Sequence, residues 1–143
     1  VSDRVVYDGE WTNGTMHGQG TLNLSDGGVY VGQFVDAEQH GQGRHTYSSG
    51  AVYDGEWKNG RRHGDGEEKF RSGFEYKGQF VDGLRGGHGA AKYVDGSKYT
   101  GQWADGLKEG AGKYEWADGA VYAQLQGTSA SMYRHRRHRA RQL

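Results

Sequence analysis

The sequence predicts an all-β protein built as one elongated antiparallel sheet of stacked hairpins. Three observations predict this class: a repeat of 23 residues, a two-residue alternation inside each repeat, and glycine-rich turn signals between the alternating stretches. The absence of proline from all 143 residues agrees with it, because proline has no N–H to donate to a neighbouring strand. The length fits one domain.

Tyrosine and glycine mark the repeat most clearly. A glycine follows each of the first five repeat tyrosines by two positions, and Trp or Phe follows that glycine by two more. A sixth unit fades where Gln124 and Gln126 replace the glycine and the aromatic residue, which is typical of the terminal unit of an array. The repeat tyrosines are Tyr7, Tyr30, Tyr53, Tyr76, Tyr99 and Tyr122.

The alternation predicts two strands in each unit. Alternate residues of a strand share a face, so Tyr7, Gly9 and Trp11 lie together on the first strand. On the second strand, Gly18, Gly20, Leu22 and Leu24 lie together. We expect Trp11 near Gly18, Gly9 opposite Gly20 and Tyr7 opposite Leu22, so that large rings lie beside bare backbone.

Turn signals bound these strands. Asn13-Gly14 is a hairpin signal, and Ser25–Gly28 is expected to link one hairpin to the next. Ala37 stands where the other units have a turn glycine, which predicts an altered turn in the second unit.

Composition excludes several classes of protein. Hydrophobic residues make up 33% and mean hydropathy is −1.00, but aromatic residues reach 13%, which argues against disorder. No stretch approaches the ~20 apolar residues of a membrane span, and no signal peptide is recognisable. Without cysteine there is no disulfide framework.

The pattern Y-x-G-x-[WF]-x-x-G-x-x-x-G-x-G, over residues 7 to about 122, resembles the MORN repeat. The resemblance implies a single-layer, twisted antiparallel β-solenoid with a groove lined by the repeat aromatic residues. Family members act mostly as scaffolds and adaptors, often in cytoskeletal, ciliary, basal or junctional structures. Some are proposed to bind phosphoinositides, and others carry a separate enzyme domain, for which this chain has no room.

The aromatic row is the candidate protein-binding groove. A single layer has no second layer to cover its aromatic face, and exposed apolar surface often marks a partner site. We predict that a helical or extended segment of a partner lies along this row; the alternative is that the rings are only the core of a thin sheet. The predicted groove residues are Tyr7, Trp11, Tyr30, Phe34, Tyr53, Trp57, Tyr76, Phe80, Tyr99 and Trp103.

The recurring histidines His17, His40 and His63 suggest a metal site, but their spacing argues against it. Successive repeats lie ~10 Å apart along a sheet, whereas metal–nitrogen bonds are ~2 Å. We therefore expect the histidines to serve the hairpin turns, and we predict no metal and no cofactor.

No enzymatic chemistry is expected either. Gly87–Ala91 approximates a dinucleotide fingerprint but lacks the strand–turn–helix context that the motif needs. Asp8/Glu10 and Asp54/Glu56 pair acids on the face opposite the rings, where we expect solvent, and no set of acid, base and nucleophile accompanies them.

The C-terminal end differs in charge from the repeats. We place the repeat array at residues 1–126, and a linker and basic tail at 127–143, with Arg134, Arg136, Arg137, Arg139 and Arg141 in the tail. The alternatives for the tail are a solvated segment, a contact with anionic phospholipid or an acidic protein, a helix docked on a partner, and a nuclear signal. Nucleic-acid binding is not favoured.

Both ends of an open sheet expose an unpaired strand, here near Val5–Trp11 and Val121–Leu125. We expect the C-terminal edge to be covered by a partner, by the tail or by a second copy of the chain.

Taken with the resemblance, these features predict a non-enzymatic scaffold inside a larger cytoskeletal or ciliary assembly such as the axoneme. The expected location is the cytoplasm. The alternative function is a peripheral membrane module that binds anionic phospholipids through the basic tail.

Overall fold

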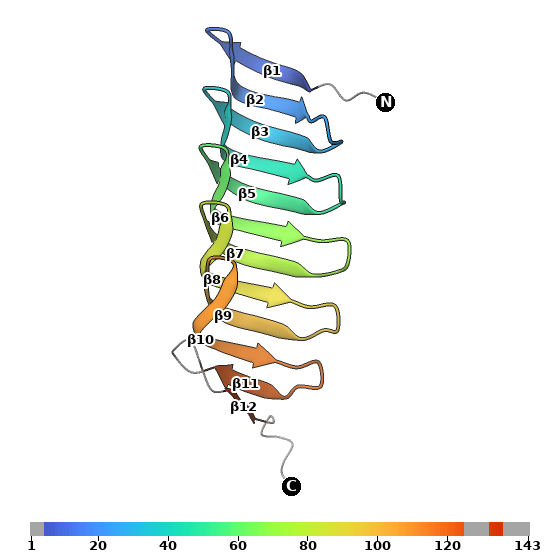
Figure 1. Ribbon diagram of the computed structural model, residues 1–143, viewed down its shortest axis with the longest axis vertical. Coiled ribbons are helices and arrows are strands. Elements are labelled where there is room, and N and C mark those ends of the chain that lie inside the picture. Colours follow the sequence, from blue (N-terminus) through green and yellow to red (C-terminus); the bar gives the residue numbers. More distant parts are fainter. Residues whose placement is uncertain (1–4, 125–131, 136–143) are drawn as a thin grey trace.

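A single sheet of twelve strands runs through the computed structural model, which describes residues 5–124 and 132–135 (Figure 1). Each strand pairs with the next one along the chain, and every pair is antiparallel. The strands stack from one end of an elongated molecule to the other in one layer, which confirms the predicted fold class (Figure 1). No described helix is long and apolar enough to span a membrane. The strands are β1 (Val6–Thr12), β2 (Thr15–Asn23), β3 (Val29–Val35), β4 (Glu38–Thr46), β5 (Val52–Lys58), β6 (Arg61–Lys69), β7 (Glu75–Val81), β8 (Leu84–Lys92), β9 (Lys98–Ala104), β10 (Leu107–Glu115), β11 (Val121–Gln124) and β12 (Met132–His135).

The hairpin turns have two central residues with positive φ, as a type I′ turn requires. Asn13 and Gly14 have φ of 51° and 82°. The prediction of an altered turn in the second unit is wrong, because Asp36 and Ala37 keep the same conformation, with φ of 49° and 71°. The neighbouring repeat holds this turn in place, since the N–H of Ala37 donates to the Met16 carbonyl at 2.9 Å.

The linking turns also repeat along the chain. In the first, the N–H of Gly27 donates to the Leu24 carbonyl at 3.0 Å, and Gly27 has φ of 95°. The Asp26 carboxylate accepts the N–H of Gly28 at 2.8 Å. A short polar side chain before glycine thus closes the turn with its own hydrogen bond.

The strand register confirms two of the three expected pairs. Tyr7 lies opposite Leu22 and Gly9 opposite Gly20. The third expectation is wrong, because Trp11 pairs with Met16 and Gly18 lies opposite Phe34 of the next repeat. The register shifts between Gly9 and Trp11, where His17–Gln19 of β2 face Glu10 alone, and each of the five hairpins has this shift.

Glu10, which lies at this shift, supplies a hydrogen bond where the backbone ladder is interrupted. Its carboxylate accepts the N–H of Gln19 at 2.7 Å, and its carbonyl accepts the Tyr7 hydroxyl at 2.7 Å. Glu56 bonds the N–H of Asp65 at 3.3 Å in the same way. Glu10 is exposed, as expected of a solvated face, and Glu56 is half-buried; both glutamates also have a structural role that the sequence did not predict.

The core is a row of tyrosine rings lying over glycine. Four repeat tyrosines have no exposed surface: Tyr30, Tyr53, Tyr76 and Tyr99. The Tyr30 ring lies edge-on to Phe34 of its own repeat at 5.1 Å and to Trp57 of the next at 5.3 Å. A Cβ at Gly43 would lie 2.5 Å from Cε1 of Tyr30, so the ring occupies the space that a side chain would take.

The tail contributes to the sheet. Met132–His135, which lies within the expected tail, forms β12 and pairs with β11, for example Val121 with His135. Of the three coverings considered for the C-terminal edge, the structure shows the tail. These four residues are a strand and not the helix considered for this segment.

Candidate protein-binding groove

Most of the predicted groove residues form the core. Of the four central rings, Tyr53 and Tyr76 are 0% exposed, Phe80 1% and Trp57 5%. The expectation that part of each ring remains exposed is therefore wrong for these residues. In the N-terminal unit, Tyr7 is half-buried and Trp11 is 58% exposed, and no described strand precedes β1.

The rings are buried because glycine lets them lie flat on the backbone. Trp57 also donates its indole N–H to the Gly43 carbonyl at 3.1 Å, and Trp103 does the same to Gly89. Each polar tip of a ring is thus bonded inside the layer, as buried tyrosine and tryptophan require. A single layer can therefore bury its own aromatic face.

A second, mostly aromatic row remains accessible after strands β2, β4, β6, β8 and β10. Phe70 is 36% exposed, and its equivalents in the other repeats are half-buried. The rings touch along the array: Phe70 and Phe74 have centroids 5.6 Å apart, and Phe74 and Tyr93 5.3 Å. We call this row the aromatic rim; it comprises Leu24, Tyr47, Phe70, Phe74, Tyr93, Tyr114 and Trp116.

The rim lies outside the first strand of each repeat, whose aromatic residues make up the predicted groove. A signal was present, since four of the five residues at one repeat position are aromatic: Tyr47, Phe70, Tyr93 and Trp116, with Leu24 as the fifth. The linking turn that follows obscured this row.

Beside the rim lies a hollow of about 420 Å³. It opens between the third repeat and the linking turn before it, so its wall combines apolar rings with charged groups. It is lined by Tyr47, Ser48, Ser49, Ala51, Val52, Tyr53, Arg62, Glu68 and Phe70.

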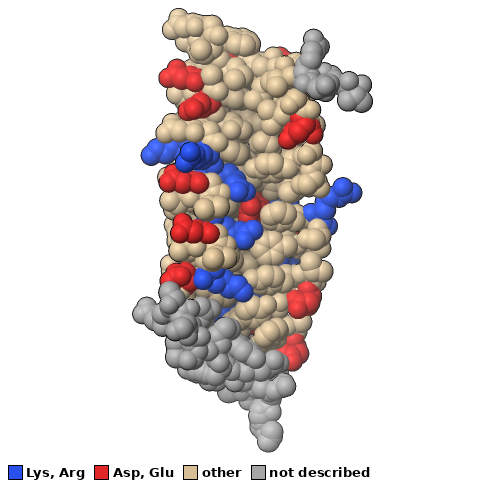
Figure 2. All heavy atoms as spheres, in the orientation of Figure 1, with Lys and Arg blue, Asp and Glu red and all other residues tan. Residues whose placement is uncertain are grey.

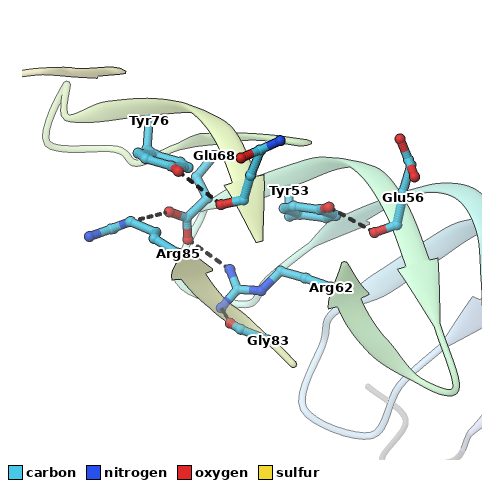
Figure 3. Close-up of polar contacts among 8 residues, drawn as sticks. Tyr53, Glu56, Arg62, Glu68, Tyr76, Gly83 and Arg85 are labelled. Atoms are coloured by element: carbon cyan, nitrogen blue, oxygen red, sulfur yellow. Dashed lines mark hydrogen bonds and ion pairs between the residues drawn. The ribbon is translucent and has the colours of Figure 1, made fainter. Parts of the chain in front are cut away.

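A charged network forms the inner wall of this hollow (Figure 3). Glu68 is 7% exposed at its side chain and accepts from Arg62 Nη1 at 2.7 Å and from Arg85 Nε at 2.8 Å. Arg62 also donates from Nη2 to the Gly83 carbonyl at 2.7 Å. A buried carboxylate needs such partners, because a charge left unpaired in the interior is costly. The network ties β6 to β8 and fixes the direction of both guanidinium groups.

Three cations at one repeat position lie over buried rings of the core and half-buried rings of the rim. Arg62 is 5.5 Å from the Tyr53 centroid and 5.3 Å from that of Phe80. Arg85 lies over Phe74, Tyr76 and Trp103 at 5.0, 5.3 and 5.6 Å. Lys108 lies over Tyr93, Tyr99 and Tyr114 at 5.4, 5.3 and 5.1 Å. Cations within ~6 Å of a ring centroid are attracted by its face.

The surface around these groups carries both signs of charge. On the face that Figure 2 shows, acidic and basic side chains are interspersed over the middle of the array, and neither sign covers that face alone.

Burial shifts the pKa of several titratable groups of the core. Burial raises the pKa of Tyr30 and of Tyr76 to about 12, so both hydroxyls remain donors at neutral pH. Burial lowers the pKa of His45, which stacks on Tyr47 with centroids 4.0 Å apart. Its Nδ1 has no hydrogen-bond partner among the described residues.

His17 is bonded to a hairpin turn, as predicted. Its Nδ1 accepts the N–H of Asp36, in the next turn, at 3.3 Å. Within the described ranges, no three His, Cys, Asp or Glu side chains are grouped to hold a metal ion.

The other sequence candidates lie in regular strand. Gly87–Ala91 belongs to β8, which pairs with β9 and leads into no helix. Asp54 bonds Arg44 on the neighbouring strand at 3.1 Å. Arg134 belongs to β12, and the other tail arginines, Arg136, Arg137, Arg139 and Arg141, lie outside the described residues.

Stacked hairpins with a rim and a hollow along one side define an elongated β-repeat protein. Five consecutive segments match the MORN repeat, at residues 7–29, 30–52, 53–74, 76–98 and 99–121. The protein belongs to the MORN-repeat family. MORN repeats are generally scaffold modules that bind proteins or membranes, and the repeat is itself non-enzymatic.

Comparison with the curated proteins found no match. Among solved structures, the chain is similar to the TCP domain of SAS-4 from Drosophila melanogaster, determined in complex with a proline-rich motif of Ana2. The TM-score is 0.33 at 13% identity, over 84% of this chain and 85% of that chain. A similarity of this size says nothing about a ligand of the present protein.

Proposed function

We propose that this protein is a non-enzymatic scaffold that binds an elongated segment of another protein along the aromatic rim. The hollow beside Tyr47 and Phe70 is the observation that carries the proposal, because it joins exposed rings to a charged wall. Aromatic side chains and arginine are the residues most often found as binding hot spots.

This proposal moves the binding face from the first-strand rings to the rim. The first-strand rings remain essential beneath it, since they hold the sheet on which the rim stands. A partner that runs along the array meets at least one rim side chain per repeat, because equivalent positions recur at about 10 Å, or two strand spacings. The repeat period therefore favours an elongated segment over a compact ligand.

Site-specific photo-crosslinking tests the face used. A photoreactive residue at Phe70 should crosslink a partner in native extract, and one at Val31 should not. Val31 is the matched control because it is 49% exposed and its neighbour Tyr30 points to the other face. The captured protein is then purified and titrated against Phe70→Ser, which should weaken binding about thirtyfold, because one hot-spot contact contributes about 2 kcal/mol. Crosslinking from Val31 alone would move the site to the opposite face.

The proposal extends to place: we expect this scaffold in the cytoplasm, within a cytoskeletal or ciliary assembly. Family resemblance alone supports this part, and imaging of the tagged protein with cytoskeletal and axonemal markers tests it. A membrane role through the tail would depend mainly on Arg136, Arg137, Arg139 and Arg141, which lie outside the described residues.

A further inference from the structure

One repeat position beside the aromatic rim changes from uncharged to basic residues along the array; we call the rim and the side chains at this position the groove. The position holds Met16 and Gln39 in the first two repeats, and Arg62, Arg85 and Lys108 in the next three. We call these last three residues the cation row. One half of the groove is therefore uncharged at this position and the other half is basic.

Among the described residues, the carboxylate that bonds the cation row is Glu68, through Arg62 and Arg85. Lys108 lies one repeat further along and forms no ion pair with another described residue. The three cations and Glu68 together carry a net charge of +2.

The number of hydrogen-bond donors that remain available for a ligand increases toward the C-terminal repeats. Arg62 has both Nη groups engaged, on Glu68 and on Gly83. Arg85 uses Nε on Glu68, and within the described ranges its Nη groups have no hydrogen bond. Lys108 is exposed and, among the described residues, has only the three tyrosine rings beneath its ammonium.

Contact with the rings fixes where these charges stand. Long side chains normally lose rotamer freedom when they bind, but a cation already held over aromatic faces has less to lose. The cation row therefore holds its positive charges in fixed positions. A bound carboxylate would form charge-assisted hydrogen bonds with them, which are stronger than neutral ones.

The repeat spacing selects the shape of the acidic partner. Neighbouring cations are two strands apart, about 9.6 Å. In an α-helix, residues seven apart lie about 10.5 Å apart on nearly the same face. An extended chain covers about 10 Å in three residues, but its side chains alternate, so residues three apart point to opposite sides. A helix matches the row and a strand does not.

We propose that the groove binds an acidic helix, with Asp or Glu at seven-residue intervals over the cation row and an apolar end over Met16 and Gln39. This inference rests on the proposed function, since it names the partner chemistry for the same face. It also assigns the helix a direction, because the acidic end lies over the fourth and fifth repeats.

A displayed library of 18-residue helices, randomised on one face, provides the probe. The full-length chain selects binders, and the best peptide is synthesised and titrated against variants. Lys108→Gln should weaken it about tenfold, the loss of one charge-assisted contact, and Lys108→Arg should restore it. Lys98→Gln is the matched control: it removes the same charge from an exposed lysine whose neighbour Tyr99 points to the groove face, and it should change affinity less than about twofold. Melting temperatures verify that all variants fold.

Selected helices with acids seven apart, together with the Lys108 dependence, would support the inference. Selected peptides that lose affinity with Phe70→Ser but carry no acidic pattern would overturn it and leave the proposed groove intact. If no selected peptide depends on Phe70, the groove itself is refuted. Equal losses for Lys108→Gln and Lys98→Gln would reduce the effect to general charge. If the Lys108 dependence appears with phosphatidylserine vesicles and not with peptides, the row belongs to a lipid surface and the helix is excluded.

Discussion

Adding one methyl group at Gly66 should destabilise the centre of the array. The new Cβ would lie 2.5 Å from Cζ of Tyr53, well inside the ~3.5–4.0 Å of an ordinary carbon contact. The ring cannot move aside easily, since it is 0% exposed and packs edge-on against Trp57 at 5.1 Å and Phe80 at 5.0 Å. Its hydroxyl is also bonded to the Glu56 carbonyl at 2.8 Å.

The expected loss follows from three contributions. Overpacking costs about 2–3 kcal/mol, and displacing the tyrosine hydroxyl from its acceptor costs about 1 kcal/mol. Replacing glycine restricts the unfolded chain and returns about 0.4–1 kcal/mol. The free energy of unfolding should therefore fall by about 3 kcal/mol, which lowers the melting temperature by roughly 10 °C for a chain of this size.

Thermal unfolding followed by circular dichroism measures this shift. Gly86→Ala is the matched control, since Gly86 is also a strand glycine but its nearest neighbour is 3.3 Å away, on the exposed side chain of Val81. We expect little change from it. If Gly66→Ala melts at the wild-type temperature, or no lower than Gly86→Ala, the account of tyrosine rings lying over glycine is refuted.

Three further predictions concern conformation and protonation. Ala37→Gly should raise stability by about 0.5–1 kcal/mol, because relief of ~1–2 kcal/mol of left-handed strain exceeds the entropy that glycine costs; a lower melting temperature would contradict this. The pKa of His45 is lowered from 6.5 in the fold, so the unfolded chain binds a proton first, and stability should be full above pH ~6.5 and fall as the pH drops below it. His45→Leu, which copies Leu22 of the first repeat, should flatten that dependence in urea titrations at several pH values. The pKa values of Tyr30 and Tyr76 are about 12 in the fold against 10.0 in the unfolded chain, so both residues stabilise the fold fully below pH ~10 and lose this contribution as the pH rises. Tyrosinate absorbance should therefore appear together with unfolding. Ionisation of all tyrosines in the intact fold would refute this prediction.

Much of the fold could be predicted from the sequence, because turns and strands depend on residues that are close together in the chain. Positive φ at both centres of a hairpin turn requires residues such as Asn13-Gly14, and a two-residue alternation requires strand. The pairs Tyr7 with Leu22 and Gly9 with Gly20 follow from the turn and the alternation together. The predicted register is wrong at Trp11. The shift opposite Glu10 depends on a hydrogen bond from the N–H of Gln19 to the Glu10 carboxylate, and the two-residue alternation does not predict that bond.

The sequence predicted an accessible aromatic surface, and the structure places that surface on other residues than the predicted ones. Sequence reasoning identified an aromatic face from Tyr53, Trp57 and their equivalents, but it assumed that a single layer leaves such a face open. In three dimensions, rings from adjacent repeats close over glycine, and the accessible aromatic surface moves to the rim around Phe70.

The sequence by itself determined the repeat, its number of units, the strand class and the family, because each is a pattern of residue types along the chain. Only the tertiary structure decided which rings are buried and how Glu68 joins Arg62 to Arg85 across β6 and β8. It also decided that Met132–His135 pairs with β11. Burial and pairing depend on contacts between residues of adjacent repeats. A 23-residue pattern shows which residue types recur, but it does not show how closely each ring packs against the next repeat.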